Sequence, residues 1–167
     1  RKHKVELYYK IYDKLKMINN DIKFSSDFII SYPGETNEDF LETLELIKKV
    51  KFINSYSFIF SPRPGTTAAT YPQIDPKISK KRLEITQDLL FSYQRENNSR
   101  FLGKEIEVLV ENKLDNQNRL FGRNKYLTPV ILEGNDDEIG KLVNVKINNF
   151  NQNTLFGKVI RNNIKAA

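Results

Sequence analysis

The 167-residue sequence contains no cysteine, no tryptophan and a single histidine. Without cysteine, the chain has no disulfide, no thiolate zinc site, no cysteine nucleophile and no ligand of its own for a cysteine-bound iron–sulfur cluster. The histidine, His3, lies in a polar N-terminal stretch, and no nucleophile-elbow motif occurs elsewhere to match it. A solvated terminal residue is the better interpretation, so we assign no catalytic residue.

Long apolar runs are missing as well. The longest, such as 28–30 and 58–60, are far shorter than the roughly 20 residues that cross a bilayer. We therefore expect no transmembrane helix and no membrane partner. The sequence opens at Arg1 with charged residues in place of an apolar signal core, which favours a cytoplasmic protein and suggests that Arg1 is a cut point within a longer chain.

Negative charge is scarce at one end of the chain. The 27 Lys and Arg exceed the 21 Asp and Glu, for a net charge of +6, and residues 139–167 contain no acid at all. Lys146, Lys158 and Arg161 are candidates for one electropositive face there. Tyr126, Phe150 and Phe156 are candidates to stack on bases. A solvated lysine-rich surface explains the same residues equally well.

Residues 1–100 alternate between helical and extended patterns. A helix is predicted over 5–18, and a strand buried on both of its faces over 27–32. Thr36 and Asp39 form a capping-box pattern that opens a second helix. Its apolar stripe is Phe40, Leu44, Ile47 and Val50.

A second strand is predicted over 52–60, followed by an ordered loop rich in proline over 61–66. Asp75 and Pro76 are a typical helix start, and that helix runs to about Arg100. Its predicted apolar stripe is Ile78, Ile85, Leu89 and Tyr93. The whole pattern is typical of βα units in a parallel sheet, so we place a domain boundary near Phe101.

After Gly103 the apolar period changes to two, which indicates strands. Five short strands fit this region, and Gly122 and Gly157 lie where a tight barrel needs close approach of backbones. The predicted fold class is α/β, with a partial (βα) barrel over 1–100 and a small all-β, OB-like barrel over 101–167.

Three segments carry a resemblance to a known family. DFIISYPGET at 27–36, SPRPGT at 61–66 and GRNKYLTPV at 122–130 resemble motifs of the radical S-adenosylmethionine methylthiotransferases. The first two resemble the end of the radical domain, and the third resembles the C-terminal TRAM domain. The Pro-Arg-Pro loop is similar to that of the tRNA-modifying branch.

The resemblance implies a function in tRNA modification. Members of the family attach a methylthio group to a modified adenosine beside the anticodon, using S-adenosylmethionine and two [4Fe–4S] clusters held by six cysteines. Those cysteines precede the region matched here, so this chain resembles only the last part of such an enzyme. We expect it to be inactive alone and to need the missing N-terminal portion. Supply of that portion as a separate chain is one possibility, and the sequence leaves it open.

The resemblance also implies a cofactor pocket after the first strand. Its candidate residues follow one another in the sequence: Ser31, Tyr32, Pro33, Gly34 and Glu35. A structural interpretation is strong, because Pro33 and Gly34 make a turn and Glu35 opens a helix. Ser31 replaces the glycine usual in the family, and its side chain is expected to crowd a close backbone approach.

For the TRAM-like half, the resemblance implies a tRNA-binding surface. The candidate residues are Arg123, Lys125, Tyr126, Lys146, Lys158 and Arg161.

Because the two βα units cannot close a barrel, we expect Phe28 and Phe58 to lie on strands with apolar faces and unpaired edges. Two alternatives stay open: a non-catalytic RNA-binding TRAM protein, and the remnant of an interrupted gene.

Overall fold

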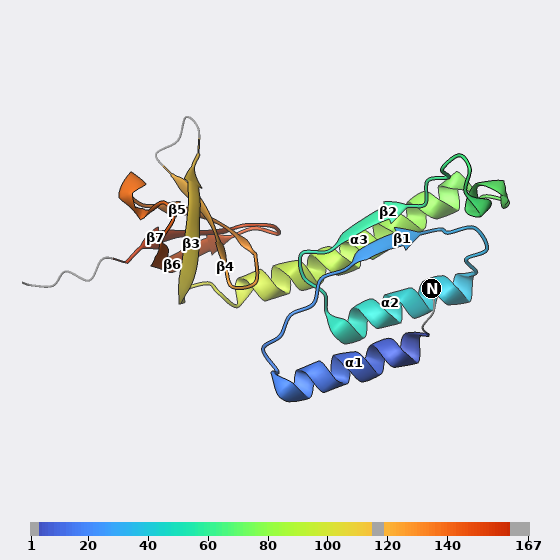
Figure 1. Ribbon diagram of the computed structural model, residues 1–167, viewed down its shortest axis with the longest axis horizontal. Coiled ribbons are helices and arrows are strands. Elements are labelled where there is room, and N and C mark those ends of the chain that lie inside the picture. Colours follow the sequence, from blue (N-terminus) through green and yellow to red (C-terminus); the bar gives the residue numbers. More distant parts are fainter. Residues whose placement is uncertain (1–3, 115–118, 161–167) are drawn as a thin grey trace, which may run out of the picture. The chain divides into compact units, whose positions relative to one another are not determined.

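The computed structural model describes residues 4–114 and 119–160 (Figure 1). The chain separates into two compact units, Arg1–Leu90 and Phe91–Ala167. The division falls inside helix α3 (Pro76–Ser99), which the two units share. Each unit is described by itself below.

The first unit joins helices to a small parallel sheet. Helix α1 (Val5–Ile18) is followed by β1 (Asp27–Ile30), α2 (Asn37–Val50) and β2 (Tyr56–Ile59), and β1 pairs with β2 in parallel. In Figure 1, α2 lies between α1 and this sheet. The helix boundaries of α1 and the parallel βα pattern are as the sequence predicts.

Helix α2 has both features predicted for it, a capping box at its start and a buried apolar stripe. The Thr36 hydroxyl accepts a hydrogen bond from the Asp39 N–H, and the Asp39 carboxylate accepts one from the Thr36 N–H, which completes the predicted capping box. The backbone hydrogen bond from Thr36 lowers the pKa of Asp39, since it favours the charged carboxylate. All four predicted stripe residues are buried: Phe40, Leu44, Ile47 and Val50.

The strands of this unit differ from the prediction in two ways. β1 is not buried on both faces: Phe28 and Ile30 are buried, whereas Ile29 is 58% exposed. Ile29 pairs in register with Phe58, which is 55% exposed. The apolar face predicted to be exposed on these strands therefore includes Phe58. Phe28, which was also predicted to lie on it, is buried on the other face of the sheet. The second strand is also shorter than predicted, because residues 52–55 form an irregular connection before it, in which Phe52 and Ile53 are buried.

Helix α3 buries a polar face, and the apolar stripe predicted for it is wrong. Ile78 and Ile85 are exposed. The buried positions recur every three or four residues along the other side of the helix: Ser79, Arg82, Thr86, Leu90, Gln94, Asn97 and Asn98. The helix start is confirmed, because the Asp75 carboxylate accepts a hydrogen bond from the Lys77 N–H at 2.6 Å.

The second unit contains a closed five-stranded barrel. Its strands are β3 (Glu105–Lys113), β4 (Leu120–Asn124), β5 (Pro129–Glu133), β6 (Leu142–Phe150) and β7 (Leu155–Val159). They pair in the order β3-β4-β5-β7-β6, and β5 pairs with β7 in parallel. This order and the alternating burial confirm the predicted OB-like barrel.

Gly122 and Gly157 lie where a neighbouring barrel strand leaves no room for a side chain. A Cβ on Gly157 would lie 2.5 Å from the Lys146 carbonyl oxygen, and one on Gly122 would overlap the Leu109 carbonyl oxygen. Only glycine fits either position, as the sequence predicts. No helix among the described residues is long and apolar enough to cross a membrane.

Candidate cofactor and RNA-binding sites

The turn after β1 holds Ser31 in an uncommon backbone conformation. Ser31 has φ of 61°, in the left-handed region that favours glycine, and Gly34 has φ of 90°. A serine at such a position is strained. The strain persists because the surrounding contacts hold the turn.

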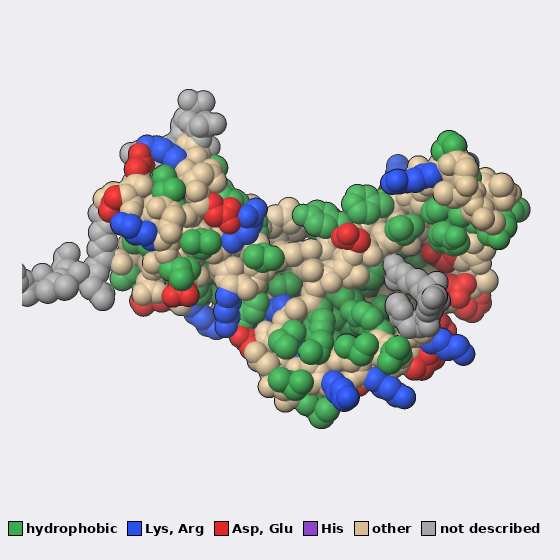
Figure 2. Space-filling view, in the orientation of Figure 1, with side chains coloured by type: hydrophobic (Ala, Val, Ile, Leu, Met, Phe, Trp, Pro, Cys, Tyr) green, Lys and Arg blue, Asp and Glu red, His purple; other side chains and the backbone are tan. Residues whose placement is uncertain are grey.

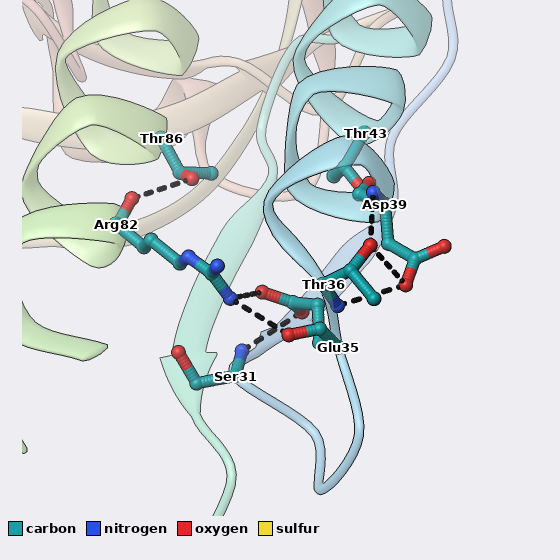
Figure 3. Close-up of polar contacts among 7 residues, drawn as sticks. All are labelled: Ser31, Glu35, Thr36, Asp39, Thr43, Arg82 and Thr86. Carbon is teal, nitrogen blue, oxygen red and sulfur yellow. Dashed lines mark hydrogen bonds and ion pairs between the residues drawn. The ribbon is translucent and has the colours of Figure 1, made fainter. Parts of the chain in front are cut away.

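Glu35 provides those contacts (Figure 3). Its Oε2 accepts a hydrogen bond from the Ser31 N–H at 2.9 Å, and its Oε1 pairs with the Arg82 guanidinium at 2.7 Å. Both side chains are nearly buried, with 10% of Arg82 and 13% of Glu35 exposed. Arg82 also donates to the Glu35 carbonyl at 3.2 Å and lies over the Phe40 ring. The carboxylate therefore has a structural role here.

Arg82 is the residue of this site that sequence reasoning missed. It lies 47 positions after Glu35, on the buried polar face of α3. No local pattern pairs the two residues. The only available signal was an arginine at helical spacing from Ser79 and Thr86, which looks like part of a solvated face.

The rest of the turn leaves one polar group without a partner. The Ser31 Oγ is buried and makes no hydrogen bond, and Tyr32 is exposed with its ring 5.0 Å from that of Phe60. Pro33 is buried, and nothing lies within 4 Å of a Cβ placed on Gly34. The turn thus has a hydrogen-bonding group and an open, partly aromatic surface at the carboxyl end of a parallel strand, where α/β folds bind ligands.

The residues present do not fit an iron–sulfur cluster. The sequence has no cysteine. Within 4–114 and 119–160, no group of three or more His, Cys, Asp and Glu side chains is placed to hold a metal ion. Ligation of a [4Fe–4S] cluster therefore requires residues outside this chain.

On the barrel, Arg123, Lys125 and Tyr126 lie at the end of β4 and in the turn after it. The Arg123 guanidinium donates to both carboxylate oxygens of Glu111, at 2.7 and 2.8 Å. The Lys125 ammonium lies over the Tyr126 ring, and this ring packs against Phe101 at 6.1 Å. Two candidate cations thus already have partners, one of them acidic.

Lys146 and Lys158 face each other directly across β6 and β7. Each is next to an acid on the far side: Lys146 lies 4.0 Å from Glu105, and Lys158 lies 3.5 Å from Glu133. All four side chains are at least half exposed, so these contacts add little stability. Two like charges opposite each other in a sheet repel, and a bound anion relieves that repulsion.

The candidate cations do not form one continuous patch. The acidic strand β3, with Glu105, Glu107 and Glu111 on its exposed side, separates Arg123 on β4 from Lys146 on β6. Arg161 lies outside the described residues. Of the aromatic candidates, Phe150 packs against the barrel core and so is not available to stack.

A polar contact joins the end of α3 to the barrel. The Asn98 amide donates to the backbone carbonyls of Asn151 and Gln152, at 3.1 and 3.0 Å. These carbonyls lie between β6 and β7, so the completely buried Asn98 side chain holds that loop.

Comparison with known proteins agrees with this geometry. Residues 99–160 match the TRAM domain family. The chain is 56% identical over 165 residues to the tRNA-2-methylthio-N(6)-dimethylallyladenosine synthase of Pelagibacter ubique (strain HTCC1062), an alignment that covers 99% of this chain and 37% of the relative. Over almost its whole length the chain is therefore similar to part of a tRNA methylthiotransferase, and it contains a TRAM domain. The resemblance to the methylthiotransferases that the three motifs indicated is therefore confirmed.

Other members of the family show the same pattern. The synthase of Wolbachia pipientis subsp. Culex pipiens (strain wPip) is 42% identical over 160 residues, covering 94% of this chain and 36% of the relative. That of Rickettsia bellii (strain OSU 85-389) is 39% identical over 163 residues, covering 96% and 36%. The chain thus spans little more than a third of the length of these relatives, and it is similar to their C-terminal, TRAM-bearing part.

Proposed function

We propose that this chain is the tRNA-binding part of an enzyme that adds a methylthio group to N(6)-dimethylallyladenosine in tRNA. The observation that carries the proposal is identity of 56% across nearly the whole chain to a synthase with that name. The closed TRAM barrel supports it, because small barrels of this order bind nucleic acids. We propose Arg123, Lys125, Tyr126, Lys146, Lys158 and Arg161 as its RNA-binding residues.

The turn after β1 is proposed to form part of an S-adenosylmethionine pocket. The exposed Tyr32 is the side chain best placed to contact the cofactor, and beside it lies the buried Ser31 Oγ, which has no hydrogen-bond partner. Pro33, Gly34 and Glu35 shape the turn, with Glu35 holding the Ser31 N–H. When bound, S-adenosylmethionine supplies the radical and the methyl group.

The iron–sulfur clusters of the reaction are proposed to belong to another part of the enzyme. This polypeptide contains no cysteine, so the ligands must come from a further segment or a separate chain. The exposed apolar side of the β1–β2 sheet, with Ile29, Tyr56 and Phe58, is where we expect that part to pack. Figure 2 shows hydrophobic side chains at the surface over these strands. We propose a cytoplasmic location, because an enzyme of this kind acts on tRNA.

The experiment that tests the proposal is binding of tRNA to the 167-residue chain as salt is raised. We expect binding at low salt that weakens steeply, because cations bound to phosphate release counterions. Replacing both Lys146 and Lys158 with Glu should weaken binding and lower the slope of log K against log salt by about 1.4, or about 0.7 for each lost phosphate contact.

The matched control is the pair Lys48→Glu and Lys80→Glu. It changes the net charge by the same amount, at exposed lysines of the first unit. We expect this variant to bind nearly as the parent chain does. Folded protein that binds no tRNA at low salt would contradict the proposed function, and equal loss in both pairs of variants would show that net charge alone is responsible.

A further inference from the structure

A row of three bulky apolar side chains crosses the outside of the barrel. Phe121 of β4 pairs in register with Ile131 of β5, and Ile131 pairs with Phe156 of β7. Side chains directly opposite each other on neighbouring strands have Cβ atoms about 5 Å apart. The three residues therefore form one continuous surface, which we call the outer apolar row.

The outer apolar row faces away from the barrel core. Each of its residues is half-buried and alternates along its strand with completely buried ones. Because successive side chains of a strand point to opposite faces, the three lie on the outside. Among the described residues, the partly buried hydrophobic ones that pack against the core are Phe101, Ile106, Val143, Phe150 and Val159. The row is not among them, so it lies outside the core at the barrel surface.

An asparagine lies at each end of the row. Asn112 of β3 is opposite Phe121, and Asn149 of β6 is opposite Phe156. In both strands the register shifts directly before the asparagine. Such bulges re-aim side chains next to functional sites. Both asparagines are exposed. Asn112 donates to the Lys113 carbonyl and Asn149 accepts from the Phe150 N–H, so each amide keeps its other end for a base edge.

Cations flank the row on both sides. The Arg123 guanidinium lies over the Phe121 ring, 5.2 Å from its centroid. Lys158 is two residues beyond Phe156 on the same outward side of β7, and Lys146 lies opposite it. A ligand seated on the row thus meets positive charge at both edges.

The acids beside these cations do not block an anion. Glu111 pairs with Arg123 and Glu133 with Lys158, but 30% of the Glu111 and 57% of the Glu133 side chain is exposed. Ion pairs at this exposure are worth little. A phosphate can therefore replace Glu133 at small cost, whereas at Arg123 it competes with the two hydrogen bonds to Glu111.

We propose that the outer apolar row is a stacking platform for unpaired bases of an RNA loop, with Arg123 and Lys158 contacting the phosphates on either side. The inference rests on the proposed function for the identity of the RNA as tRNA. β4 and β5 are the second and third strands of the barrel, the face on which OB-folds bind oligonucleotides. Aromatic rings stack on any base, and the flanking cations favour RNA over an apolar protein surface.

The test measures binding of the full 167-residue chain to a fluorescently labelled RNA hairpin with an unpaired loop. Phe156→Ala should weaken binding about 5- to 150-fold, the effect of losing one stacked base. Phe156→Tyr keeps the ring and should bind within about twofold of the parent chain. Leu142→Ala shortens an exposed leucine elsewhere on the barrel and is the control expected to bind normally.

Salt and abasic RNA separate stacking from charge. Phe156→Ala should leave the salt slope unchanged, whereas Lys158→Gln should reduce it by about 0.7. A hairpin with abasic loop positions should bind the parent chain and Phe156→Ala equally. Unchanged melting of Phe156→Ala, as expected for a residue outside the core, shows that its loss of binding is not unfolding.

Three results would overturn the platform. Equal affinity of the parent chain, Phe121→Ala and Phe156→Ala for the hairpin overturns it while leaving the proposed function intact. Absence of any tRNA binding by the parent chain overturns both. Self-association of the chain that disappears in Phe156→Ala assigns the row to a second copy of the chain in place of RNA.

Discussion

At the scale of single residues, the turn after β1 depends on a charge that comes from far along the chain. Glu35 fixes the strained Ser31 by its N–H, and Arg82 balances the carboxylate in a nearly buried position. Breaking such a pair leaves an uncompensated charge away from water. The conformation proposed to meet the cofactor thus rests on a residue that itself lies on another helix.

Arg82→Met is therefore expected to destabilise the chain by about 3 kcal/mol, the lower end for breaking a buried ion pair. Urea unfolding measures the change. Adding Glu35→Gln to Arg82→Met should recover part of the loss, because the carboxylate is then no longer unpaired. Lys48→Met, in the exposed pair with Glu45, is the control and should cost less than about 1 kcal/mol. Equal effects at Arg82 and Lys48 would contradict the structural role of the pair.

At the scale of elements, the barrel depends on two strands that carry glycine where another backbone passes. The β7 backbone at Gly157 lies against β6, and the β4 backbone at Gly122 lies against β3. A methyl group at either point has nowhere to go except by moving a strand. The closed order of the barrel, and with it the outer apolar row, requires these close approaches.

Gly157→Ala is expected to destabilise the barrel by about 1–3 kcal/mol, as overpacking does in tightly packed regions. Its new Cβ would lie 2.5 Å from the Lys146 carbonyl oxygen and 2.6 Å from the Val145 Cγ1 atom. Thermal or urea unfolding provides the measurement. Asn144→Ala, on the exposed side of β6, is the control and should stay within about 0.5 kcal/mol. A Gly157→Ala chain as stable as the control would show that the strands are not in close contact.

At the scale of the whole molecule, the two units differ in how complete they are. The barrel closes on itself and has its own buried core, whereas the described part of the first unit pairs β1 with β2 alone and leaves Ile29 and Phe58 exposed. An apolar sheet face open to water is a site for association. We therefore expect the barrel to bind RNA by itself. Catalysis is expected to need a further part of the enzyme, packed against the first unit.

The 167-residue polypeptide alone is accordingly expected to form no methylthio nucleoside. Mass spectrometry of nucleosides from tRNA, incubated with the chain and S-adenosylmethionine under reducing conditions, measures this directly. Co-expression with a polypeptide that carries the family's cluster cysteines should restore the product, because that part supplies the ligands this chain lacks. Product formed by the purified chain alone would overturn the proposed division of roles.

Local chemistry was enough to predict several elements. The capping box at Thr36 and Asp39, the stripe from Phe40 to Val50, and the alternation and glycines of the barrel are all as expected. In each, the residues that determine the structure are near in sequence or repeat at the period of the element. The predicted apolar stripe of α3 failed because that helix buries polar groups, whose partners no periodicity reveals.

What the sequence by itself determined is the order of the elements, the barrel class, the family motifs and the absence of any thiol to bind iron. Only the tertiary structure decided which side of β1 is covered, that Arg82 reaches Glu35, and that Phe121, Ile131 and Phe156 meet in one row. The physical reason is that strand register and helix packing bring together residues that are distant in the chain.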